Sequence, residues 1–365
     1  MKIGIITLPL HTNYGGILQA YALQTVLERM GHEVCLIEKK HKLLPFPLWK
    51  APFVYGKRIL NLSGDALPVF YEQSVRKYTN RFINQYIKRR IVANFSGIKG
   101  RDFDTFVVGS DQVWRPKYFL DGIEHAYLDF TKGWNVKRIA YAASFGTDEW
   151  EYTHEQTECC GKLLKHFDAI SVREDSGVAL CREHFDVEAQ HVLDPTMLLA
   201  KEDYIRLFEN ARTPNSKGTL LTYILDETPE KLAWIDRIAK EKKIVPFRVK
   251  SKVVKRGAGR QGYIQPSVEQ WLRGFYDAEF VVTDSFHACV FSILFNKPFI
   301  AIGNAQRGMS RFISLLEIFG LENRIASDLF NDKIINSEID WNRVNSTLTS
   351  RMVSSKTFLK DNLIG

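Results

Sequence analysis

Five short polar runs in this sequence follow apolar stretches, and they hold the side chains best suited to chemistry. His287 ends the run 283–287, directly after the apolar residues 280–282. An imidazole exchanges a proton near neutral pH, so a histidine beside a cleft can act as a general acid or base. A buried structural histidine is the alternative, but a position between an expected strand and an expected helix favours catalysis. Ser285 in the same run either contacts a ligand or caps that helix.

An acid and an amide stand in the run Gly-Ser-Asp-Gln-Val-Trp at 109–114. Asp111 can accept hydrogen bonds from a hydroxylated substrate or act as a general base, and Ser110 and Gln112 add polar contacts beside it. Ser110 and Asp111 are equally suited to capping the following helix. Trp114 favours a sugar as the ligand, because aromatic faces stack on the C–H surfaces of sugars.

Three arginines follow expected strands at places where an anion could bind. Arg173 carries a planar, permanently charged guanidinium that fits a carboxylate or a phosphate. An ion pair with Glu174 or Asp175 is the alternative. Arg307 and Arg311 flank a glycine-containing turn and predict an anion clamp, although arginines in a surface loop would give the same pattern.

Paired glycines, Gly15 and Gly16, stand between the first expected strand and the first expected helix. Glycines there let backbone N–H groups approach a ligand at the positive end of a helix, and we expect Asn13 and Tyr14 to join that binding surface. The loop is not a G-x-G-x-x-G fingerprint and no Walker A lysine follows it, which argues against a dinucleotide or ATP. A tight turn that simply needs glycine explains the pair equally well.

Several common catalytic patterns are missing from the sequence. It contains no H-E-x-x-H, no paired C-x-x-C and no G-x-S-x-G, which argues against a zinc hydrolase and against an α/β-hydrolase. We expect catalysis without a metal and without a bound cofactor.

The elements that position these residues follow from the alternation of short β-branched runs with segments of helical period, which is typical of α/β units. Each polar run sits where a strand ends, as expected for the carboxyl edge of a ligand-binding sheet. The expected strands are 2–8, 34–37, 105–108, 138–142, 169–172 and 191–193 in a first series, and 220–224, 244–249, 280–283 and 298–302 in a second. The expected helices are 16–30, 76–90, 230–242, 268–275, 288–295 and 310–319.

A polar stretch containing Pro214 and Gly218 separates the two series of strands. We therefore predict the fold class as α/β, with two Rossmann-like open-sheet domains that face a cleft in a GT-B-like arrangement. The predicted boundaries are 1–200 for an acceptor-side domain, 201–330 for a donor-side domain and 331–365 for helices that close the fold. Two sheet edges across one cleft favour a reaction between two separately bound substrates.

The 365-residue chain has a formal net charge of +8, and its excess charge is segregated. The tracts 39–58, 76–101 and 242–260 contain Lys and Arg but neither Asp nor Glu. Such surfaces suit phosphorylated substrates, acidic lipid headgroups or nucleic acid. The tract 39–58 interleaves its charges with Leu, Phe, Trp and Pro, which favours a peripheral membrane contact. No nucleic-acid motif accompanies the tracts, so nucleic acid is the partner that we expect least.

The sequence also bears on where the protein resides. No apolar run approaches the ~18–20 residues of a membrane-spanning helix, and the first residues predict a strand rather than a secretion signal. The five cysteines lack metal-ligand spacing and favour a reducing compartment. We expect a cytoplasmic protein with a peripheral contact at the inner face of the membrane.

Five motifs occur in a fixed order, at 13–24, 108–114, 171–174, 193–196 and 283–287. Together they resemble the polysaccharide pyruvyl transferase family, and the similarity runs from the N-terminus to about residue 325. The resemblance implies a fold like that of GT-B glycosyltransferases. It also implies transfer of pyruvate from phosphoenolpyruvate to a pair of sugar hydroxyls, as a cyclic ketal, in the synthesis of an exopolysaccharide or a capsule.

Within that resemblance, Arg173 and His287 match residues associated with donor binding and catalysis. Phosphoenolpyruvate is then the donor substrate, Arg173 binds its anions with Arg307 or Arg311, His287 acts as the acid, and Asp111 orients or deprotonates the sugar hydroxyl. The implied acceptor is a sugar on a lipid diphosphate carrier. A glycosyltransferase that uses a nucleotide sugar and a non-catalytic glycan-binding protein are the two alternatives.

Overall fold

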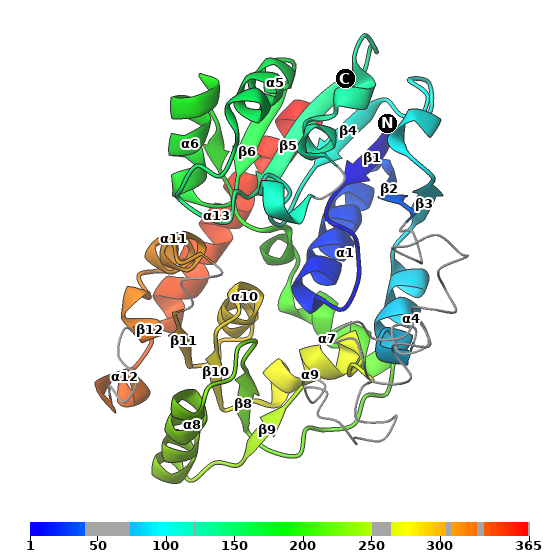
Figure 1. Cartoon of the computed structure of the whole chain (residues 1–365). Coiled ribbons are helices and arrows are strands. Elements are labelled where there is room, and N and C mark those ends of the chain that lie inside the picture. The colour runs from blue at the N-terminus through cyan, green and yellow to red at the C-terminus, as the bar shows by residue number, and fades with distance from the viewer. Residues whose placement is uncertain (41–73, 120–121, 250–263, 304–307, 327–331, 364–365) are drawn as a thin grey trace, which may run out of the picture.

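The structure is a computed structural model that describes residues 1–40, 74–119, 122–249, 264–303, 308–326 and 332–363. Parallel strands form two open sheets within these residues, with helices packed around them (Figure 1). The α/β fold class with parallel open sheets is therefore confirmed. The basic tract 39–58 and the tract 242–260 lie largely outside the described residues.

The first sheet has seven parallel strands in the order β3-β2-β1-β4-β5-β6-β7. The central strand β4 is buried at every position, which explains its uninterrupted apolar sequence Thr-Phe-Val-Val. The strand bounds are β1 Lys2–Ile6, β2 Glu33–Lys39, β3 Arg89–Val92, β4 Thr105–Val108, β5 Lys137–Ala143, β6 Ala169–Val172 and β7 Gln190–His191. The helices along this part of the chain are α1 Tyr14–Arg29, α4 Lys77–Tyr86, α5 His154–Leu164 and α6 Asp175–Phe185.

The second sheet has five parallel strands in the order β12-β11-β10-β8-β9. Its strands are β8 Leu220–Tyr223, β9 Pro246–Arg248, β10 Phe280–Thr283, β11 Phe299–Ile302 and β12 Ile325–Ala326. The helices along this part are α8 Pro229–Lys242, α9 Val268–Asp277, α10 Phe286–Leu294, α11 Ser310–Phe319 and α12 Asp332–Asn336. A Ser267 capping box begins α9, as the Ser-x-x-Gln spacing requires.

Two elements link the sheets. Helix α7, Lys201–Asn210, lies between them in sequence, and Asp203 on it receives two guanidinium hydrogen bonds from Arg29 on α1. Helix α13, Trp341–Leu363, runs back from the second sheet to the first (Figure 1). There the Ser355 hydroxyl accepts a hydrogen bond from the Leu193 amide at 3.0 Å.

The apolar core is also continuous from one sheet to the other. Tyr14 at the start of α1 donates a hydrogen bond to the Pro266 carbonyl at 2.6 Å, and its ring stacks on Trp271 of α9 with centroids 5.5 Å apart. These rings are buried in one hydrophobic cluster together with Phe291 of α10. Their burial holds α1 against the second sheet.

Two differences from the expected elements have a physical cause. The expected helix at 76–90 ends at Tyr86, because residues 89–92 pair with β2 as an edge strand. Its charged residues conceal the strand pattern: Arg89 is held by an ion pair with Glu38 at 2.6 Å. The connection at 196–218 contains helix α7, whose apolar face packs on the core through Tyr204 and Leu207.

Candidate active site

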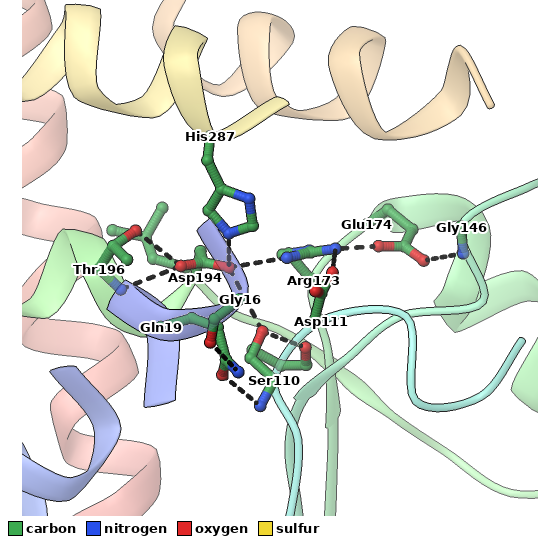
Figure 2. A network of polar contacts seen from close by, with 12 residues as sticks. Gly16, Gln19, Ser110, Asp111, Gly146, Arg173, Glu174, Asp194, Thr196 and His287 are labelled. Atoms are coloured by element: carbon green, nitrogen blue, oxygen red, sulfur yellow. Dashed lines mark hydrogen bonds and ion pairs between the residues drawn. The ribbon is translucent and has the colours of Figure 1, made fainter. Parts of the chain in front are cut away.

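The candidate site lies where the carboxyl ends of β4 and β6 and the segment after β7 meet the start of α10 (Figure 2). A pocket opens there with an empty volume of about 460 Å³, open space at its mouth included. It is lined by Asn13, Asp111, Gln112, Tyr118, Leu225, Asp284, Ser285, Phe286, His287, Arg311 and Phe312. The pocket therefore brings together residues from the sides of both sheets. These residues lie up to nearly 300 positions apart in the sequence.

His287 projects from the first turn of α10 toward the first sheet (Figure 2). Its Nε2 lies 3.5 Å from Oδ2 of Asp194, and its side chain is 7% exposed. The ring rests directly on the backbone of Gly15, where any Cβ would overlap the imidazole. The first glycine of the pair is therefore needed for close approach of a side chain from the other sheet.

Arg173 is buried in the floor of the site, with 1% of its side chain exposed. Its Nη1 donates to Asp194 Oδ2 at 2.8 Å, and its Nη2 lies 3.4 Å from Asp111 Oδ1. Glu174, the partner suggested by the sequence, is more distant, at 4.0 Å from Nε. The guanidinium also lies over the ring of Phe286, 4.4 Å from its centroid. Arg173 thus organises the carboxylates around it, and its contact with a donor stays a prediction.

Asp194 follows β7 and is the residue on which the network converges. Burial alone would raise the pKa of its carboxyl, but the nearby His287 and Arg173 charges outweigh burial and hold the pKa well below the usual range. The two hydrogen bonds from Thr196 add to this effect, the amide at 3.0 Å and the hydroxyl at 2.6 Å. Asp194 is therefore ionised near neutral pH.

This depressed pKa predicts a specific dependence of stability on pH. A carboxyl whose folded pKa lies below its unfolded value stabilises the fold above about pH 4, and that stabilisation is lost as the pH falls. Asp194→Asn removes the titrating group, so we expect the difference in free energy of unfolding between wild type and variant to shrink from about pH 5 to about pH 3. Urea denaturation at several pH values measures it. A difference that stays constant over this range would contradict the assignment.

Asp111 reaches the pocket from the loop after β4 with a left-handed backbone, φ 68°. Its carboxylate lies between Arg173 and the start of α1, with Oδ2 3.5 Å from the position that a Cβ on Gly16 would take. This is an ordinary van der Waals distance, so the carboxylate itself does not require a glycine at this position. Asp111 lines the same pocket as His287 and Arg311, from the first sheet's side.

Arg311 lies near the start of α11 and lines the pocket with 6% of its surface exposed. Burial, and then the like charge of Arg173, lower the pKa of its guanidinium to about 10, so it stays charged at neutral pH. Its guanidinium carbon is 5.7 Å from the centroid of Phe286. Both buried guanidiniums therefore lie against the ring of Phe286. The expected partner Arg307 lies outside the described residues.

Three predicted ligand contacts need correction. Trp114 is fully buried, with its ring stacked on Tyr127 at 5.2 Å and its Nε1 donating to the Ala126 carbonyl, so it offers no face to a sugar. The Tyr14 side chain is equally buried at the junction of the two sheets. Ser110 is buried as well, and its hydroxyl points to the Ala142 carbonyl and to Asp194. At the end of a strand, an apolar or small polar side chain can serve the packing of the fold as well as the binding of a ligand.

The remaining predicted residues line the pocket. Asn13 and Ser285 precede α1 and α10 and make no side-chain capping hydrogen bond. Gln112 receives a hydrogen bond from Arg115 at 3.3 Å. Whether these side chains contact substrate stays a prediction.

Sequence reasoning missed two members of the network. Gln19 on α1 accepts a hydrogen bond from the Ser110 amide at 3.0 Å and donates to the hydroxyl of Thr7, which fixes the loop after β4 (Figure 2). Asp194 belongs to a motif noted in the sequence, but its partners come from separate strands. The signal available in the sequence was an acidic residue followed by Pro and Thr at the end of a strand.

Replacement of Gly15 by alanine should change the position of His287 without weakening helix α1. Alanine favours a helix over glycine by about 1 kcal/mol, but its methyl group would displace the imidazole. With His287 as the expected acid, we predict that turnover falls by about 10²-fold, since small displacements at a reacting centre have such costs. Phosphate release from the expected donor, phosphoenolpyruvate, and thermal unfolding are the measurements. Gly97→Ala, at a position with open space, is the control and should leave both unchanged.

Two open parallel sheets that place a buried charge network and a pocket between their carboxyl edges define a protein of the GT-B structural class. The UDP-N-acetylglucosamine 2-epimerase from Rickettsia bellii has this fold and aligns with a TM-score of 0.50 and 10% identity, over 99% of this chain and 95% of its own. The corresponding epimerase from Methanocaldococcus jannaschii aligns with a TM-score of 0.49 and 12% identity, over 98% and 100%.

The chain belongs to the polysaccharide pyruvyl transferase family, whose family model matches residues 13–306. It is therefore a transferase, as the ordered sequence motifs implied. None of the curated proteins matches the sequence.

Proposed function

We propose that this protein transfers the pyruvyl group of phosphoenolpyruvate to two hydroxyls of a sugar, as a cyclic ketal, during synthesis of a surface polysaccharide. The observation that carries the proposal is the pocket that His287, Arg311 and Asp111 line together. A proton donor, a cation and a carboxylate around one space are the groups that this reaction requires.

The donor is a small molecule with a carboxylate and a phosphate, and the pocket is suited to anions. Arg311 supplies a positive charge on one side. The start of α10 supplies the backbone N–H of Phe286, which lines the pocket, and helix starts attract anions. Because Arg173 is engaged with Asp194 and Asp111, we expect Arg311 to be the principal contact of the donor anions and Arg173 to maintain the field around them.

The chemistry follows from these positions. His287 donates a proton to the methylene carbon of phosphoenolpyruvate, which becomes a methyl group and leaves an oxocarbenium-like carbon beside the phosphate oxygen. Asp111 accepts the proton of the first sugar hydroxyl as its oxygen bonds to that carbon. Phosphate then leaves with its bond electrons, and the second hydroxyl closes the ketal as its proton passes to the phosphate or back to the histidine. The products are the ketal and inorganic phosphate.

The acceptor and its location complete the proposal. We expect a sugar carried on a lipid diphosphate, at the cytoplasmic face of the membrane, with the basic tract 39–58 contacting anionic lipid. Among the described residues, no helix is both long and apolar enough to span a membrane. That part of the chain also contains no group of three His, Cys, Asp or Glu side chains arranged to hold a metal. Catalysis without a metal or cofactor stays a prediction, tested by chelation.

The deciding experiment incubates the protein with phosphoenolpyruvate and an extract of lipid-linked oligosaccharides. Release of phosphate together with a gain in glycan mass equal to pyruvate minus one water supports the proposal. Release of UDP or GDP from a nucleotide sugar would instead identify a glycosyltransferase. Glycan binding with phosphoenolpyruvate left intact would identify a binding protein. The His287→Gln protein serves as the inactive control.

A further inference from the structure

The two carboxylate oxygens of Asp194 have different tasks. Oδ1 accepts hydrogen bonds from the amide and hydroxyl of Thr196, two residues further along the chain. These local bonds fix the side chain within its own turn. Oδ2 is left for partners from elsewhere in the fold: Arg173 at 2.8 Å, the Ser110 hydroxyl at 3.3 Å and His287 at 3.5 Å.

The partners of Oδ2 come from three separate elements (Figure 2). Arg173 follows β6 and Ser110 follows β4, both in the first sheet, whereas His287 is on α10 beside the second sheet. Asp194 is 2% exposed, so these contacts form in a region of low dielectric, where charge interactions are strong. One atom therefore sets the position of the imidazole relative to the guanidinium across the junction of the sheets.

The other carboxylates around the pocket have partners of their own. Asp111 and Glu174 lie 3.4 Å and 4.0 Å from the guanidinium of Arg173. Asp284, also buried beside the pocket, is paired with Lys231 at 3.0 Å. Among the described residues, Asp194 is the carboxylate that lies within ion-pair distance of His287.

We infer that Asp194 is the positioning residue of the reaction: its Oδ2 fixes the imidazole of His287 relative to the guanidinium of Arg173 across the junction of the sheets. The inference rests on the proposed function for the identity of the substrate, but the contact between Asp194 and the imidazole does not. Asp194 reaches the reacting atoms only through His287 and Arg173. Its replacement should therefore alter the imidazole first and the rate as a consequence.

The first test observes the imidazole without any substrate. In protein labelled at its nine histidines, the His287 ring signals are assigned by their loss in His287→Gln. We expect these signals to change in chemical shift and to broaden in Asp194→Asn, because the ring loses the carboxylate that lies 3.5 Å from its Nε2 and is no longer held in one position. Arg173, Arg311, Asp111 and Asp284 stay in both proteins, so the difference reports Asp194 alone.

The second test measures turnover of phosphoenolpyruvate. We expect Asp194→Asn to lower kcat by about 10²-fold or more while KM for phosphoenolpyruvate changes little. The matched control is Asp203→Asn, which also removes a buried carboxylate paired with an arginine but lies on α7, outside the site. It should lose stability and keep kcat. Thermal unfolding of both variants separates the two effects.

A second variant guards against failure of Asp194→Asn to fold. Asp194→Glu keeps the charge and displaces the oxygen, so kcat should fall although a carboxylate is still present. The inference is overturned if the His287 ring signals are the same in wild type and Asp194→Asn, or if both Asp194 variants lose activity only as far as they lose stability. If the ring signals differ between the two proteins but the wild-type protein leaves phosphoenolpyruvate intact, the contact is supported and the proposed function is refuted.

Discussion

Replacement of His287 by alanine is expected to slow phosphate release from phosphoenolpyruvate by at least ~10²-fold while the protein stays folded. General acid–base groups contribute about 10²–10⁴-fold to rates, and no other imidazole lines the described pocket. Asp194 keeps Arg173 and Thr196 as partners in this variant, so we expect the protein to stay folded, with a lower midpoint of thermal unfolding. Rate and unfolding midpoint are measured on the same preparation.

His287→Gln gives the sharper comparison for this prediction. Glutamine keeps a polar group of similar reach beside Asp194 but cannot exchange a proton near neutral pH. We expect it to preserve binding of phosphoenolpyruvate, measured by thermal stabilisation, and to lose turnover. If either variant released phosphate at near the wild-type rate, His287 would not be the acid.

The largest effect on stability is expected from Arg173→Ala. Removal of one partner from a buried ion network leaves uncompensated charge, which costs about 3–5 kcal/mol. Here the loss exposes Asp194, Asp111 and Glu174 to mutual repulsion without their shared cation. The free energy of unfolding from urea denaturation measures the effect. Arg173→Lys restores the charge without the planar fork and should recover part of the stability.

An exposed arginine provides the control for this measurement. Arg182 pairs with Glu188 at 2.9 Å, but the two side chains are 67% and 75% exposed. Solvent screens such pairs, so Arg182→Ala should leave the free energy of unfolding nearly unchanged. If Arg173→Ala and Arg182→Ala lost similar free energies of unfolding, burial would not explain the contribution of Arg173 to stability.

Much of the fold could be predicted because its signals are local. Strands β4, β6 and β10 are short apolar runs that end in polar residues, and their predicted bounds match the observed ones. Strand β3 could not be predicted in the same way. This edge strand is stabilised by its pairing with β2 and by the ion pair of Arg89 with Glu38. Neither contact can be inferred from the four residues of the strand itself.

The sequence by itself determined which residues stand at the carboxyl ends of strands, and hence that Asp111, Arg173 and His287 gather at one edge of each sheet. Parallel strands place their carboxyl ends together, so this part of the site needs only local pattern. The ordered motifs added the family, which the match to residues 13–306 confirms.

Only the tertiary structure decided which of those side chains meet and which turn inward. Tyr14 faces the core because Pro266 and Trp271, about 250 residues away, cover it. Asp194 joins Arg173 to His287 because one oxygen is fixed by its own turn and the other meets elements of both sheets. Side-chain orientation depends on neighbours distant in sequence, and burial makes those contacts strong. The chemistry of the site is therefore a property of the folded chain, although its residue types were present in the sequence.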